Sequence, residues 1–226
     1  MKKLLCDHSL VVQVDQTAAT LRLHTDGATL WDGRLFSLSH LTTTMFRDTA
    51  DQLTRWLDQH VREQGATLVL TALHGGVVRS PLHRRLYHIL APVLADRTVT
   101  ANAIADMASQ LIGLGEGLTP SGDDLLVGFL AVIHLTQQAT TLLQAPIWLD
   151  PLVAHTTDLN AAFLRCALTG HFSEPMVRLI HALYDGPPRA WQSRATDLAQ
   201  VGHSSGVDAM VGIAFASQLL ASADIT

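Results

Sequence analysis

The first part of the chain alternates apolar and polar residues in a way that is typical of strands. Residues 10–38 are rich in Val, Thr and Leu, and apolar and polar positions follow one another with a period near two. The sequence "TDG" at residues 25–27 supplies a turn between two of these segments. We therefore expect a small antiparallel sheet in this region.

From Phe46 onward the apolar residues recur every three or four positions. The residues that share this spacing are Phe46, Ala50, Leu53, Trp56, Leu57 and Val61. They predict one long amphipathic helix, which Gly65 would end. Residues 66–76, "ATLVLTALHGG", form a short apolar run before a glycine pair and are predicted as one more strand.

After about Ser80 the pattern is typical of helices. The Ala- and Leu-rich segments, separated by Gly, Pro or Ser, are residues 81–94, 100–112, 122–143, 149–169, 173–184, 189–199 and 206–222. The predicted class is α+β, with a small antiparallel β-rich N-terminal part followed by a larger α-helical C-terminal part. We divide these parts at residue 80, giving residues 1–80 and 81–226, and expect them to form one compact unit.

Composition narrows the function classes. The chain has 226 residues, 48% of them hydrophobic and 15% charged, which is enough to bury an ordinary core. The formal net charge is -5 and no stretch gathers the basic residues, so we expect no nucleic-acid partner. Its two cysteines are too few for a disulfide framework, and no apolar run approaches a membrane span of about 20 residues. We expect a cytoplasmic protein with no membrane partner.

The most informative segment is "GLGEGLTPSGDDLLVG" at residues 113–128. Gly113, Gly115 and Gly117 are costly to order, and an ordinary helix start requires none of them. Such a loop can point backbone N–H groups at an anion beside a helix N-terminus, so phosphate or carboxylate is the expected ligand. The spacing fits neither the dinucleotide fingerprint nor a phosphate-binding loop with its lysine.

A shorter relative of this segment lies near the other end of the chain. "SGDDLLVGF" at residues 121–129 aligns without gaps with "SGVDAMVGI" at residues 205–213, with five identities in nine positions. Simple capping is one explanation: Ser121 and Ser205 would be N-caps, each with an aspartate three residues later. The glycines Gly128 and Gly212 instead indicate two helices that cross closely.

Several polar side chains around the two segments are candidates for chemistry. A close crossing would bring Ser121, Asp124, Ser205 and Asp208 together. The carboxylates that could hold Mg²⁺ as a cofactor are Glu116, Asp123, Asp124 and Asp208. Alternatively, Asp123 is solvated and Asp124 only caps its helix. His203 could transfer a proton near neutral pH, and Arg79, after the glycine pair, could clamp a carboxylate or phosphate. The alternatives are a structural histidine and a surface arginine in a turn.

Together, "LIGLGEGLTPSGDDLLVGFLA" and "GHSSGVDAMVGIA" resemble the AllH-like family, which is associated with oxamate carbamoyltransferase. The resemblance covers the chain best from about Ala101 onward. It implies a subunit of an assembly that converts oxalurate and phosphate into oxamate and carbamoyl phosphate during allantoin and purine breakdown. The motif positions that carry over are Gly113, Gly115, Gly117, Thr119, Pro120, Ser121, Gly122, Asp123, Asp124, Gly202, His203, Ser204, Ser205, Gly206 and Asp208.

The leading hypothesis is therefore a carbamoyltransferase subunit that binds a small anionic substrate and other protein subunits. The predicted catalytic residues are His203, Asp124 and Asp208. The predicted substrate- or anion-binding residues are Gly113, Gly115, Gly117, Thr119, Ser121, Gly122, Ser204, Ser205, Gly206 and Arg79. The predicted metal ligands are Asp123, Asp124 and Asp208. One alternative is a non-catalytic regulatory subunit that binds an anion or metabolite, and another is a helical scaffold whose motifs serve only packing.

Overall fold

The computed structural model describes most of the chain. The described residues are 2–6, 9–13, 20–24, 31–61, 64–77, 80–97, 99–143, 153–187 and 190–223. They form two compact units, Met1–Asp32 and Gly33–Thr226, so the division falls after Asp32 rather than at residue 80.

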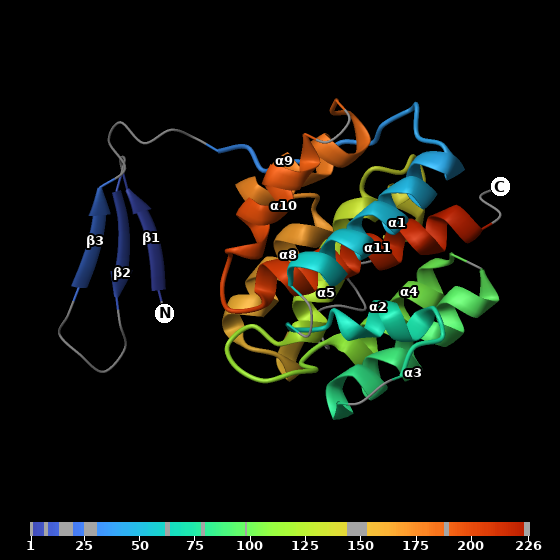
Figure 1. The fold of residues 1–226 in the computed structure, drawn as a ribbon. Helices are drawn as coiled ribbons and strands as arrows, with labels where there is room; N and C mark the ends of the chain where they lie inside the picture. Colours follow the sequence, from blue (N-terminus) through green and yellow to red (C-terminus); the bar gives the residue numbers. More distant parts are fainter. Residues whose placement is uncertain are drawn as a thin grey trace. The chain divides into compact units, whose positions relative to one another are not determined.

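The first unit contains one small antiparallel sheet (Figure 1). Its strands, in the order β1-β2-β3, are β1 (Lys2–Cys6), β2 (Ser9–Gln13) and β3 (Thr20–His24). Lys2 pairs with Gln13 in one ladder, and Gln13 pairs with Thr20 in the next. Consecutive strands are therefore neighbours throughout the sheet.

The second unit is built from helices (Figure 1). They are α1 (Thr43–His60), α2 (Leu68–Leu73), α3 (Pro81–Asp96), α4 (Ala101–Leu111), α5 (Ser121–Ile133), α6 (Ala139–Leu142), the 3₁₀ turn η1 (Val153–His155), α8 (Asp158–Leu168), α9 (Glu174–Tyr184), α10 (Trp191–Ala199) and α11 (Ser205–Ser222). The long amphipathic helix predicted from Phe46 onward is confirmed as α1. The predicted segment at residues 122–143 is interrupted after Ile133.

The predicted α+β class is wrong, because the chain is predominantly helical. Residues 66–76, predicted as a strand, contain α2 and bury Val69, Leu70 and Ala72. A short apolar run suits a buried helix as well as a strand, so the pattern alone could not separate them. Residues 33–38 are irregular, and within the described part of the second unit the only β pairing is the isolated bridge between Arg34 and His171.

The core of the second unit is centred on α5 and α11, which pack against each other, while α1 lies along α11 (Figure 1). Every residue of α5 except Val127 is buried, as is every residue of α11 from Gly206 to Ser217. By length and composition α11 could cross a membrane, but 78% of the relevant window is buried inside the unit. Such burial is typical of the core helix of a folded protein.

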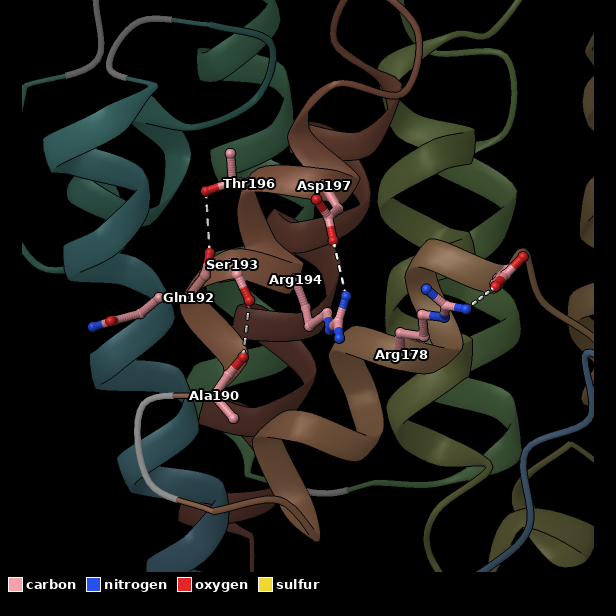
Figure 2. Close-up of polar contacts among 8 residues, drawn as sticks. Arg178, Ala190, Gln192, Ser193, Arg194, Thr196 and Asp197 are labelled. Carbon is pink, nitrogen blue, oxygen red and sulfur yellow. Dashed lines mark hydrogen bonds and ion pairs between the residues drawn. The ribbon is translucent and has the colours of Figure 1, made fainter.

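Polar side chains of α9 and α10 make contacts within their own helices (Figure 2). Arg178 pairs with Glu174 one turn earlier, and Arg194 pairs with Asp197 at 3.3 Å. The Ser193 hydroxyl donates to a backbone carbonyl of the same turn. Exposed pairs of this kind contribute little to stability, so the burial around α5 and α11 is the main stabilising feature.

Candidate functional site

The two related motifs meet where α5 crosses α11. An added Cβ at Gly128 would lie 1.9 Å from the carbonyl oxygen of Ala209, and one at Gly212 would lie 1.9 Å from that of Leu125. Only glycine lets the two backbones approach this closely, which offsets its poor helix propensity. The predicted close crossing is confirmed, and it brings the first turns of both helices together.

In each helix the glycine at the second position donates its backbone N–H to a carbonyl of the preceding loop. The Gly122 N–H donates to the carbonyl of Leu114 at 2.8 Å, and the Gly206 N–H donates to that of Val201 at 3.0 Å. The first span covers eight positions (122 minus 114) and the second five (206 minus 201), so the first loop is three residues longer. The longer loop has an exposed tip at residues 115–118.

The alternative that Ser121 and Ser205 are N-caps is wrong. The cap position of each helix is the residue before the serine, and neither helix has a side-chain cap bond. Each serine hydroxyl instead interacts with a carboxyl group on the opposite helix and lowers its pKa: Ser205 acts on Asp124, and Ser121 acts on Asp208. The close crossing puts a better acceptor within reach than the serine's own helix offers.

Asp124 begins a chain of polar groups that leads to the glycine-rich loop. Its carboxyl interacts with the Ser205 hydroxyl, whose oxygen lies 2.8 Å from the Thr119 hydroxyl oxygen. Asp124 is 7% exposed, and its Oδ2 atom has no hydrogen-bond partner among the described residues. Thr119 is only half-buried and follows the exposed tip of the loop. This group of side chains therefore extends from the buried Asp124 to the half-buried Thr119 in the loop.

Burial raises the pKa of Asp124 from 3.8 to about 7. The charges of Asp208 and Asp123 raise this pKa further, while the hydrogen bond from Ser205 opposes the rise. Removing a carboxylate from water disfavours its charged form, and a nearby like charge acts in the same direction. Asp124 is thus divided between its protonated and ionised forms near neutral pH.

This raised pKa predicts a specific pH dependence of stability. The folded chain holds the Asp124 proton more tightly than the unfolded chain, so this contribution is complete below about pH 4 and is lost as the pH rises through 7. In Asp124→Asn the contribution is absent. We expect the variant to gain about 3 kcal/mol relative to the wild type between pH 4.5 and pH 8, measured by urea unfolding. Parallel pH profiles for the two proteins would contradict the assignment.

Asp208 has a different set of partners, which the sequence did not reveal. Its Oδ1 atom accepts a hydrogen bond from the Ala66 N–H at 2.6 Å. At Gly65, whose φ is +53°, an added Cβ would lie 2.1 Å from the same oxygen. The Gly65 carbonyl also accepts a bond from His83 Nε2 at 2.8 Å. Asp208 therefore fixes the turn between α1 and α2 against the start of α11.

The pKa of Asp208 is also raised, chiefly by burial. Hydrogen bonds from the Ala66 N–H and from the hydroxyls of Ser121 and Ser204 oppose this rise, as does the nearby His83. Asp208 therefore interacts with more groups of the protein body than Asp124 does, and among the described residues no hydrogen bond joins it to Thr119 in the loop.

Asp123 is not solvated. Its hydrogen bonds go to groups other than the serine hydroxyls that interact with Asp124 and Asp208. It is fully buried, and its Oδ1 atom accepts the Gly113 N–H at 2.8 Å. Its Oδ2 atom accepts the Asn160 side-chain amide at 3.1 Å and the Thr156 hydroxyl. The alternative that Asp123 is solvated is wrong. Its partners on the α8 side lie more than 30 positions away, so no local pattern could have indicated them.

The remaining predicted site residues are only partly brought together. His203 is exposed, and its backbone carbonyl accepts a bond from the Gln64 side chain. Gly202, with a φ of +65°, lies in the turn beside it. The N–H groups of Gly122 and Gly206 are already used within their own loops. Arg79 lies outside the described residues.

The described residues do not bring the predicted metal ligands into one group of three. Among the described residues, no group of three or more His, Cys, Asp and Glu side chains is arranged to hold a metal ion. Both oxygens of Asp123 already accept hydrogen bonds from other parts of the chain. Mg²⁺ binding by Asp124 and Asp208 stays a prediction.

One family model matches a part of the chain that is slightly less than half of its length. The sequence model of the family described as "Oxamate carbamoyltransferase subunit AllH" matches residues 111–217. This confirms the resemblance noted from the two motifs, and the matched segment contains both loops and the whole crossing of α5 and α11. No solved structure matches the chain.

Proposed function

We propose that this chain is a cytoplasmic subunit of an oxamate carbamoyltransferase-type enzyme, which converts oxalurate and phosphate into oxamate and carbamoyl phosphate in allantoin and purine breakdown. The family description names a carbamoyltransferase subunit, and a subunit implies other protein chains. The observation that carries the proposal is the group of Asp124, Ser205 and Thr119, because all three lie within the matched segment.

The reaction requires a proton to move. A phosphate oxygen attacks the carbamoyl carbon of oxalurate, a carbon–oxygen bond forms and the carbon–nitrogen bond to oxamate breaks. The leaving nitrogen gains one proton, and the attacking hydrogen phosphate loses one, so the reaction is balanced. A group whose pKa lies near the working pH is best suited to supply and recover that proton.

Asp124 has the properties that this step requires. Its pKa of about 7 lets it hold a proton at neutral pH and also release it. The hydroxyls of Ser205 and Thr119 connect it to the loop, so Thr119 is the group that would meet the substrate. In this proposal Asp208 holds the start of α11 in place, and His203 stays an untested candidate for proton transfer.

The near-complete burial of Asp124 and Asp208 favours a second candidate function. In a regulatory subunit that binds an anion or metabolite without catalysis, the same carboxyl groups would serve only to hold the two helix starts together. The two functions differ in one observable: whether a conservative change at Asp124 alters turnover or only stability.

The proposal is tested with the assembled complex. The full chain, carrying an affinity tag, is expressed in its native cell and isolated with whatever subunits accompany it. We expect this preparation to form carbamoyl phosphate only when oxalurate and phosphate are both present. A complex that contains the chain but forms no carbamoyl phosphate from them would refute the proposed reaction.

A further inference from the structure

A groove of about 640 Å³ lies beside the glycine-rich loop. Arg85 of α3 lies on one side, and Ser109 and Gln110 at the end of α4 continue the lining. Gly113 of the glycine-rich loop and His155 of the η1 turn also line the groove. None of its lining residues belongs to the chain of groups that begins at Asp124.

The buried carboxylate of Asp123 holds two walls of this groove together. It accepts the Gly113 N–H from the loop and the Thr156 hydroxyl from the residue after His155. An added Cβ at Gly113, whose φ is +77°, would lie 2.2 Å from the carbonyl oxygen of His155. The loop and the η1 turn are therefore fixed against each other, and the groove is formed before any ligand binds.

The charge of the lining selects a class of ligand. The Arg85 side chain is exposed and forms no ion pair with any described residue, and no carboxylate lines the groove. A guanidinium presents several donors in a fixed geometry that matches carboxylate and phosphate oxygens.

We infer that the groove between Arg85 and His155 binds a small oxyanion, the carboxylate or phosphate group of a substrate. Arg85 donates to its oxygens, and the side chains of His155 and Gln110 offer further donors. This inference rests on the proposed function for the identity of the anion. Its binding, however, is measured without turnover.

The test compares two neighbouring arginines. Arg84 is also exposed but does not line the groove, so Arg84→Ala is the matched control for Arg85→Ala. The full chain is titrated with inorganic phosphate and, separately, with oxamate, at constant ionic strength maintained with chloride. We expect saturable binding of at least one of them, weakened at least about tenfold in Arg85→Ala and unchanged in Arg84→Ala.

The separate titrations with phosphate and with oxamate identify which of these oxyanions the groove binds. The absence of saturable binding by the wild type, or an equal loss in both variants, overturns the inference. Groove binding without carbamoyl phosphate formation by the complex would refute the proposed function and leave the groove assignment standing. Turnover with unchanged KM values for both substrates in Arg85→Ala would refute the groove and leave the function standing.

Discussion

Replacing Gly128 with alanine is expected to destabilise the fold by about 2–3 kcal/mol, with a similar effect at Gly212. At each position the added methyl group would lie 1.9 Å from a backbone carbonyl oxygen of the other helix. Because the obstacle is backbone, no side chain can rotate away, and α5 and α11 must separate. Helix propensity works in the opposite direction, since alanine is favoured over glycine by about 1 kcal/mol.

Thermal unfolding measures this effect. For a chain of this length, a loss of about 2–3 kcal/mol corresponds to a Tm lowered by roughly 4–12 °C. Gly117→Ala is the matched control, because an added Cβ there meets no atom within 4 Å and only the φ of +88° is unfavourable. If Gly128→Ala were no less stable than Gly117→Ala, the close crossing would not be the feature that holds these helices.

The second large effect is expected on catalysis. Asp124→Asn keeps the size of the side chain but removes its ability to hold and release a proton, so turnover by the complex should fall about 100-fold or more. The same substitution should stabilise the fold at pH 8, because it removes a buried carboxylate. A loss of activity accompanied by a gain of stability cannot be explained by unfolding.

The internal repeat supplies a control for this prediction. Asp208 occupies the position in α11 that Asp124 occupies in α5, but it accepts the Ala66 N–H, and among the described residues no hydrogen bond joins it to Thr119. Asp208→Asn retains an oxygen for the Ala66 bond and should therefore change turnover much less. Equal losses in both variants would show that the two carboxyl groups act together rather than in the roles assigned here.

The sequence contained enough information to predict the helical body and the crossing. The spacing of Phe46, Leu53 and Leu57 indicated α1, since burial of one helix face requires that period. Gly128 and Gly212 have no local reason to lie inside helices, so their repetition at equal distance from a Ser-x-x-Asp sequence indicated a close contact.

What could not be predicted depended on distant partners. Ser121 and Ser205 have the local signature of N-caps, but the opposite helix provides each with a carboxyl group. The partners of Asp123 come from residues 156 and 160, and Asp208 meets Ala66. The groove beside Arg85 forms only when α3, α4 and η1 are in place. Such contacts arise from tertiary packing and leave no periodic trace in the sequence.

The central claim is that Asp124 holds the proton that carbamoyl transfer requires, and the pH dependence of turnover tests it most directly. We expect kcat of the wild-type complex to change with an apparent pKa near 7, and the residual turnover of Asp124→Asn to lack this transition. The same transition in both proteins, or full turnover in Asp124→Asn, would contradict it.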